Sequence, residues 1–212
     1  TYCNQVTSYI RSLIRKGTLE IGAPVKEAVL SEQLGISRAP IREALQVLVQ
    51  EGLITSEPQK GKHVRQMTGK EIYDSYVVAG ILEGAGVAES LPLWTEANME
   101  TFRSVVRQME GKISYATKLD ELAEIDELFH ATLFMACDNT RLVEMARTSC
   151  ATISKYLYYQ HWITMFTPRE YADRHHAVAE AVYSRDVKHV ETALRDHYKE
   201  TGLRMAQFGK EA

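Results

Sequence analysis

Cysteine is scarce in this chain, and long apolar runs are missing. The three cysteines, Cys3, Cys137 and Cys150, are odd in number and show no metal or redox spacing. This excludes a disulfide framework and fits a reducing compartment. The apolar runs are too short to predict a membrane span, and no signal-peptide pattern opens the chain. No repeat or low-complexity tract is visible. We therefore expect a cytoplasmic globular protein.

The composition is ordinary, but the charge is unevenly distributed. The 212 residues, of which 45% are apolar and 25% charged, fit one large domain or two small ones. The formal net charge of −3 divides into +3 over residues 1–66 and −6 over the remainder. A basic N-terminal third on an acidic body suits a contact with a polyanion at one end of the molecule.

The first third of the sequence predicts three helices followed by a hairpin. Apolar periodicity, capping residues and Gly or Pro breaks place helices near 6–14, 27–34 and 37–51, and strands near 53–56 and 63–66. This order of elements is that of a winged helix-turn-helix, in which the second helix of the motif enters the major groove of DNA.

Candidate DNA contacts follow from this arrangement. On the third helix, the polar side chains lie away from the apolar stripe of Ile41, Leu45 and Leu48, where they can pair with bases or phosphates. The candidates are Arg38, Ala39, Arg42 and Gln46 on the helix and Lys60, Gly61 and Lys62 at the hairpin. The alternative is a solvated charged face on a surface helix, which the order of elements disfavours.

After Gln66 the strand signals disappear. Thr68 and Glu71 form a capping box that starts the first of about six helices. We expect these helices near 69–89, 95–115, 118–137, 140–164, 168–184 and 187–208. The predicted fold class is therefore mainly α, with a winged helix-turn-helix over 1–66 joined to an all-α bundle over 67–212.

Four residues of the helical part have the composition of a metal site. Asp126 and His130 lie four apart, so a helix places them on one face beside its apolar stripe. His175 and His197 lie on two later helical patterns that can supply further ligands. Three imidazoles and one carboxylate favour zinc, with nickel or manganese as alternatives, over calcium or magnesium. The alternative is a set of unrelated paired or surface histidines.

Residues 21–66 resemble the GntR family of bacterial transcription regulators. The run LSEQLGISRAPIREAL at 30–45 is similar to the family signature, and the later Glu51-Gly52-Leu53-Ile54 and Gly61 continue it. The resemblance implies operator recognition by Arg38 and Arg42, with a wing around Gly61. The chain departs from the family at Ala28, where the family often has an Arg that contacts DNA.

Residues 67–212 resemble the FadR-type effector domain of that family. The runs DELFH at 126–130, HHAVAEAV at 175–182 and RDH at 195–197 match its metal-binding elements. The resemblance implies a bound metal with His175, rather than His176, as ligand, and a small organic acid as effector. The family commonly has an Arg where this chain has Ala79. The family arginine can bind a carboxylate through two hydrogen bonds. In this chain, four other arginines are candidates for that role: Arg103, Arg141, Arg147 and Arg169.

An aromatic cluster in the helix expected over 140–164 has two interpretations. Tyr156, Tyr158, Tyr159, His161 and Trp162 follow one another closely. They form either a pocket wall that stacks on an effector or a packing surface in the core or between subunits, and the second interpretation is favoured.

Together these features predict a metabolite-responsive bacterial repressor. We expect a homodimer that binds a palindromic operator in double-stranded DNA, with Met67–Gly69 as a hinge. Two alternatives keep the regulator but make the metal its signal or only a structural element. A metal-dependent enzyme is the third alternative, and it leaves the DNA-reading motif unexplained.

Overall fold

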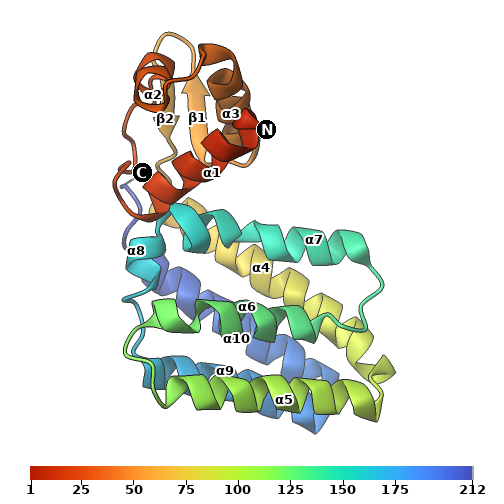
Figure 1. The fold of residues 1–212 in the computed structure, drawn as a ribbon. Coiled ribbons are helices and arrows are strands. Elements are labelled where there is room, and N and C mark those ends of the chain that lie inside the picture. The colour runs from red at the N-terminus through yellow and green to blue at the C-terminus, as the bar shows by residue number, and fades with distance from the viewer. Residues whose placement is uncertain (212) are drawn as a thin grey trace.

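The computed structural model describes residues 1–211 and begins with a winged helix-turn-helix. Its elements are α1 (Tyr2–Arg15), α2 (Glu27–Leu34), α3 (Arg38–Gln50), β1 (Ile54–Glu57) and β2 (Gly61–Val64) (Figure 1). The two antiparallel strands reach closer to the turn than expected, because Glu57 pairs with Gly61. Positive φ angles at Gln59 (65°) and Gly61 (83°) close this tight turn. The predicted order of elements is confirmed.

In the described part of the chain, a body of seven α-helices follows the wing. Its helices are α4 (Gly69–Ser90), α5 (Glu96–Ile113), α6 (Ala123–Leu133), α7 (Thr140–Ser149), α8 (Tyr159–Trp162), α9 (Pro168–Ser184) and α10 (Val187–Ala206). The capping box at Thr68 is confirmed, and the side chains of Thr167 and Asp186 also accept a backbone N–H in the first turn of their helices. Ser37, which precedes α3 and has the residue type of a cap, makes no side-chain cap bond. The mainly α fold class is therefore confirmed.

Two of the expected helices have different bounds. The single helix expected over 140–164 is wrong: α7 ends at Ser149, a π-helical turn covers Ile153–Leu157, and only the four-residue α8 follows. A π turn carries an extra residue, which rotates the side chains that follow it. Here it lets Ile153, Leu157 and Tyr158 all join one hydrophobic core. The helix expected over 118–137 starts as a 3-10 turn and ends at Leu133.

Helix α4 is the central element of the body. It packs along α10, and small residues allow the close approach: a Cβ added at Gly80 would lie 2.8 Å from Cβ of Tyr198, and one at Gly202 would lie 2.8 Å from Cβ of Tyr76. With the 3-10 turn that follows it, α4 is long and apolar enough to cross a membrane by length and composition. Half of its most apolar stretch is buried inside the structure, as in a core helix.

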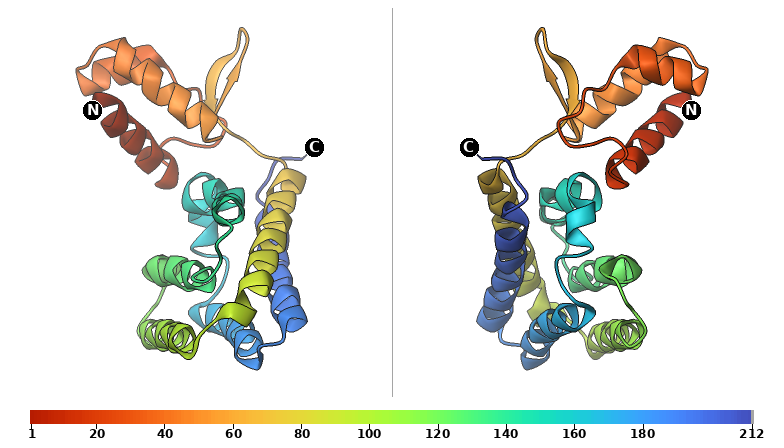
Figure 2. Two further views of the ribbon diagram at one scale, coloured as in Figure 1. Left: turned by 90° about the vertical axis from the view of Figure 1, so that its right-hand side faces the viewer. Right: turned by 90° about the vertical axis from the view of Figure 1, so that its left-hand side faces the viewer.

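The head, which we define as α1 to β2, rests on one end of the helical body (Figure 2). One hydrophobic cluster lies wholly within the body, whereas a second runs from the head into the body. This second cluster includes Ile10 and Leu48 of the head together with Tyr76 of α4, Ile153 of the π turn and Met205 of α10. Packing is therefore continuous across the expected boundary between residues 66 and 67.

The segment that connects head and body is anchored by two contacts. The Tyr158 hydroxyl accepts from the Met67 backbone N–H (3.1 Å) and lies 3.3 Å from the Met67 carbonyl oxygen. Near the other end of the chain, Lys210 N donates to the Met67 carbonyl (3.0 Å), and Gly69 N donates to the Lys210 carbonyl (3.3 Å). The expected hinge at Met67–Gly69 is thus held by side-chain and backbone bonds in this conformation, and its movement stays a prediction.

Candidate metal centre, cavity and nucleic-acid interface

Three of the four predicted metal ligands meet inside the helical body. His130 of α6, His175 of α9 and His197 of α10 each offer a ring nitrogen, and these nitrogens lie within 4.8 Å of one another. Asp126, one turn before His130, stands beside the cluster, with Oδ1 3.1 Å from His175 Nε2. Residues that lie 22 to 71 positions apart on three different helices thus converge, because α6, α9 and α10 pack into one bundle.

Hydrogen bonds orient two of the three imidazoles. His175 Nδ1 lies 2.8 Å from the Tyr171 carbonyl oxygen, and His130 Nδ1 lies 2.6 Å from Glu83 Oε1. Both contacts leave Nε2 as the nitrogen that can coordinate a cation, which is the usual arrangement around metal-bound histidines. His197 Nδ1 is buried without a hydrogen-bond partner in the described residues, and His175 Nε2, which also makes no hydrogen bond there, has only the ion-pair contact with Asp126 Oδ1 at 3.1 Å. Unpaired buried nitrogens are costly, and a cation would satisfy them, so the residues fit a divalent metal.

The pKa values of the three clustered histidines shift in different directions. Burial lowers the pKa of His175 and of His197, and for His197 the nearby Arg174 adds to the effect. Burial also opposes a charged His130, but the charge and hydrogen bond of Glu83 outweigh it and raise the pKa of His130 to about 9. Neutral imidazoles are the form that binds metals, so His175 and His197 are ready ligands at neutral pH.

The cluster opens into a cavity of about 800 Å³, a volume typical of small-molecule sites. Helix α4 contributes only Tyr76 and Glu83 to its described lining. Glu83 is buried and occupied by two bonds, since Tyr198 Oη donates to its Oε2 at 2.7 Å and His130 contacts its Oε1. Neither Glu83 nor Tyr198 stood out as a site residue in the sequence. In the sequence, Glu83 is distinguished only by being an acidic residue within an apolar run.

The four arginines considered as substitutes for the family arginine differ in whether they line the cavity. Arg147 lines the cavity, whereas Arg103, Arg141 and Arg169 bind acidic residues on their own helices elsewhere. Ala79 is fully buried. The described lining also holds Arg15, Lys155 and Arg174, three cations that no sequence motif marks as site residues. The aromatic residues Tyr156, Tyr159 and Trp162 lie in the same wall.

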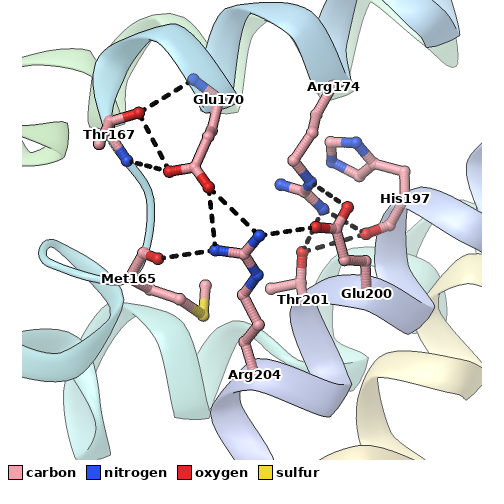
Figure 3. Close-up of polar contacts among 8 residues, drawn as sticks. All are labelled: Met165, Thr167, Glu170, Arg174, His197, Glu200, Thr201 and Arg204. Carbon is pink, nitrogen blue, oxygen red and sulfur yellow. Dashed lines mark hydrogen bonds and ion pairs between the residues drawn. The ribbon is translucent and has the colours of Figure 1, made fainter.

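A half-buried arginine network adjoins the histidine cluster at His197 (Figure 3). Arg174 of α9 donates to Glu200 Oε2 (2.8 Å) and to Thr201 Oγ1 (2.6 Å) on α10, and also binds the carbonyl oxygen of His197 (2.5 Å). Its guanidinium carbon lies 4.0 Å from the centroid of the Phe166 ring. Because Arg174 precedes His175 in sequence and holds the backbone of His197, it fixes two of the three histidine-bearing segments relative to each other.

The head presents the predicted DNA contacts on its surface. Arg38, Ala39, Arg42, Gln46, Lys60 and Gly61 are exposed, while Lys62 is half-buried. Glu27 of α2 joins the recognition helix to the wing, since it accepts from Arg42 (3.3 Å) and from Lys62 (3.1 Å). Burial raises the pKa of Glu27, but these two cations outweigh it and lower that pKa. The residue after Glu27 is Ala28, so no side-chain charge follows at that position.

The segment Cys150–Gln160 touches both the cavity and the head. Ser154, Lys155, Tyr156 and Tyr159 line the cavity. On the other side, Arg15 of α1 donates to the Tyr159 hydroxyl (2.7 Å), and Gln160 donates to the carbonyl oxygen of Arg15 (2.8 Å). The Arg15 guanidinium also lies over the Tyr159 ring, 4.0 Å from its centroid. A side chain of the DNA-binding head therefore forms part of the cavity wall.

Comparison with known families agrees with both parts of this arrangement. Residues 3–64 match the gntR family of bacterial regulatory proteins, and residues 74–200 match the FCD domain. The chain belongs to the GntR family and is of the FadR type. Members of this family are DNA-binding transcription regulators, so the expectation of a regulator rather than an enzyme is confirmed.

Individual relatives of this GntR regulator are named as repressors. It is 26% identical over 193 residues to the HTH-type transcriptional repressor RspR of Escherichia coli K12, covering 90% of this chain and 82% of the relative. It is 31% identical over 146 residues to a probable D-xylose utilization operon repressor of Paenarthrobacter nicotinovorans, covering 68% and 62%. It is 29% identical over 136 residues to the gluconate operon repressor of Bacillus subtilis, covering 64% and 55%.

A solved structure shows that the fold is shared along the whole chain. Escherichia coli McbR/YncC superposes with a TM-score of 0.71 over 98% of both chains at 19% identity. At that identity the likeness supports the fold of this GntR regulator and not its ligand.

Proposed function

We propose that this GntR regulator is a cytoplasmic repressor that binds a palindromic operator and responds to a small organic acid. The observation that carries the proposal is the position of the histidine cluster. The three histidines line a cavity of about 800 Å³, and the wall of that cavity also includes Arg15 of the DNA-binding head. The names of the relatives support repression. We propose residues 1–66 as the DNA-binding part and 67–212 as the effector part.

The proposed metal ligands are Asp126, His130, His175 and His197. Zinc suits this mixture of imidazole and carboxylate, and nickel or manganese are alternatives. When bound, a divalent cation supplies positive charge at which an acid effector can place its carboxylate. The chain's own contribution is orientation, since Glu83 and the Tyr171 carbonyl fix two imidazoles, and Arg174 holds the backbone of His197.

DNA binding is assigned to the exposed side of α3 and to the wing. Arg38, Arg42 and Gln46 are proposed to reach bases or phosphates in the major groove, beside the small Ala39. Lys60, Gly61 and Lys62 are proposed to follow the backbone next to it. The salt bridges of Glu27 to Arg42 and Lys62 hold helix and wing in one register. Specific base contacts therefore come from a prearranged surface.

A homodimer is proposed because a palindromic operator requires two heads related by a two-fold axis. Helix α4 offers a surface for it: Val78 is 45% exposed and Ile81 41% exposed, although the opposite side of the same helix is core. Met145 on the adjacent α7 is 45% exposed. Covering these apolar side chains in a second copy would stabilise the dimer by roughly 25 cal/mol per Å² of apolar surface buried.

Effector binding is proposed to reach the head through Cys150–Gln160. A ligand that displaces Tyr159 or Ser154 in the cavity moves the residues to which Arg15 and Met67 are bonded. If the effector weakens DNA binding, DNA must weaken effector binding by the same factor.

The test combines operator selection with a metal and acid titration. The metal-loaded protein selects its operator from random duplex DNA, and fluorescence anisotropy then measures affinity with and without a panel of acids. We expect at least one acid to weaken binding tenfold or more, about 1.4 kcal/mol, and a chelator or His175→Ala to abolish that response. Loss of operator binding on chelation, with no response to any acid, would favour the metal as the signal.

That second candidate, a metal sensor, is favoured by one observation. Position 79 holds a fully buried alanine rather than the arginine that would clamp a carboxylate. If no operator is selected at all, the proposal of a DNA-binding repressor fails with both candidates.

A further inference from the structure

The residues that follow α10 fold back onto the segment that connects head and body (Figure 2). Lys210 N donates to the Met67 carbonyl oxygen (3.0 Å) and Gly69 N donates to the Lys210 carbonyl oxygen (3.3 Å), so that Lys210 forms a parallel bridge with Thr68. Gly69 is the first residue of α4, and the first N–H groups of a helix have no partner within it. Lys210 therefore satisfies one of these groups. We call Phe208–Lys210 the strap.

Two glycines allow the strap to lie against the start of α4. A Cβ added at Gly209 would overlap Gly69 N and would lie 2.6 Å from both Gly69 Cα and the Thr68 carbonyl carbon. A Cβ added at Gly69 would lie 2.6 Å from the Ala206 carbonyl oxygen. These are backbone atoms, so no side-chain rotation relieves the contacts. Gly209 does not have a positive φ angle, so the close approach is what requires glycine at this position.

A stacking contact fastens the strap to the residues after the π turn. The ring of Phe208 lies on that of His161, with centroids 4.0 Å apart and planes inclined by 14°. His161 comes shortly after Tyr158, whose hydroxyl accepts from Met67 N (3.1 Å). Phe208 also packs against the hydrophobic cluster that runs from the head into the body. The backbone of Met67 is therefore held from two sides, by Tyr158 at its N–H group and by the strap at its carbonyl group.

The residue before Met67 is not held in this way. Arg65 N donates to the Leu53 carbonyl oxygen (2.9 Å), which ties Arg65 to the head. Gln66 is exposed, and its backbone N–H and carbonyl groups make no hydrogen bond within the described residues. Gln66 thus stands alone between the last backbone bond of the head and the first bond to the body at Met67. Rotation of the Gln66 backbone redirects the head without breaking either bond.

We infer that the strap pins Met67–Gly69 to the helical body and thereby confines movement of the head to a hinge at Gln66. Hinges are commonly a few residues that absorb a change in backbone angles, and the strap shortens this one to a single residue. A short connection keeps the two heads of a dimer at a defined separation, whereas a longer flexible connection does not. The inference rests on the proposed homodimer only for this last consequence.

Amide hydrogen exchange on the full chain tests the strap. Gly209→Ala places a methyl group against the backbone of Gly69, so the strap must open. We expect the Gly69 amide to exchange about tenfold faster, because it loses one hydrogen bond, to Lys210. The Glu71 amide is the internal control, since it donates to the Thr68 hydroxyl (3.1 Å) and should keep its rate.

Two further variants complete this experiment. Gln207→Ala is the matched control, because Gln207 is exposed and directly precedes the strap, and it should leave both exchange rates unchanged. Phe208→Leu removes the ring that stacks on His161 without adding bulk, and it decides in the same way if Gly209→Ala does not fold. An unchanged rate at Gly69 would overturn the inference. Equal acceleration at Gly69 and Glu71 would show that the start of α4 unravels, and would overturn it too.

Operator binding tests the hinge. The ratio of the affinities for the full selected operator and for one half-site reports how well the connection places the two heads, while the half-site affinity reports an intact head. We expect Gly209→Ala and Gln66→Gly each to lower this ratio about tenfold, within the usual range of coupling between sites. Gln66→Gly should do so without faster exchange at Gly69, because glycine loosens the hinge and leaves the strap closed.

The outcomes separate the inference from the proposed function. A wild-type ratio in Gly209→Ala, despite faster exchange at Gly69, would show that the strap does not place the head. A wild-type ratio in Gln66→Gly would reject Gln66 as the hinge. If the wild-type protein selects no operator, or binds a half-site as tightly as the full operator, the proposed repressor or its homodimer fails, and the exchange rates alone decide whether the strap pins Met67–Gly69.

Discussion

The close packing of α4 on α10 makes a strong prediction about Gly80. A methyl group in Gly80→Ala would lie 2.8 Å from Cβ of Tyr198, 3.3 Å from Cα of Arg195 and 3.4 Å from the Leu194 carbonyl oxygen. Two of these atoms belong to the backbone of α10, so the helices must separate. Overpacking of this kind costs about 1–3 kcal/mol, while the better helix propensity of Ala returns up to about 1 kcal/mol.

The net loss should therefore be about 1–2 kcal/mol. For a chain of this size each kcal/mol shifts the melting temperature by about 2–4 °C, so we expect Gly80→Ala to melt about 2–8 °C below wild type. Gly111→Ala is the matched control, because Gly111 also lies in a helix and its added Cβ would meet nothing within 4 Å. It should melt at or up to about 4 °C above wild type.

Calorimetry measures the melting temperatures of both variants. If Gly80→Ala melts at or above Gly111→Ala, the reasoning about helix contact is refuted. A second readout tests the link to the histidine cluster. Moving α10 lengthens the 2.7 Å bond from Tyr198 to Glu83, which in turn orients His130. Zinc affinity should then fall about 10–100-fold, as for other changes behind metal ligands, while Gly111→Ala keeps wild-type affinity.

Three other changes test the head, the cluster and their connection. Arg38→Ala should weaken operator binding by about 1–3 kcal/mol, measured by fluorescence anisotropy at several salt concentrations. Equal weakening for the operator and for unrelated DNA sequences would show that Arg38 contributes charge but no base specificity. Tyr159→Phe, which removes the acceptor for Arg15, should leave acid affinity within about twofold in calorimetry but reduce the operator response to acid; an intact response would exclude this route. Glu27→Gln tests a group whose pKa is lowered by Lys62 and Arg42 against burial. Its stabilising effect is present above the ordinary value of 4.5 and is lost as pH falls through the folded pKa. The melting difference from wild type should therefore shrink on acidification, and a constant difference would contradict the ion-pair explanation.

Local sequence patterns predicted most of the helices and strands. Helix starts such as Thr68 and Thr167 were predictable because a capping side chain and its partner lie three residues apart. The break after α7 was not, because the π turn at Ile153–Leu157 is stabilised by packing against the head, a contact distant in sequence. Periodicity within one helix does not contain that information.

The residues of the candidate site also differ in whether the sequence alone could predict them. His130, His175 and His197 could be selected from residue type and family resemblance, and the fold brings them together. Glu83 and Arg15 could not, because each acts through a partner on another element.

The shared wall formed by Arg15 and Cys150–Gln160 limits how freely the two parts of this regulator can be exchanged. A hybrid sensor that joined these helices to the head of another regulator would replace Arg15 and the apolar residues of α1 that meet the π turn. If effector binding reaches the head through Cys150–Gln160 as proposed, such a hybrid would bind its new operator and its old ligand, but ligand binding would no longer affect operator binding. To stay switchable, it would have to inherit the end of α1 together with the effector part, so the portable unit of this protein extends beyond the helical body.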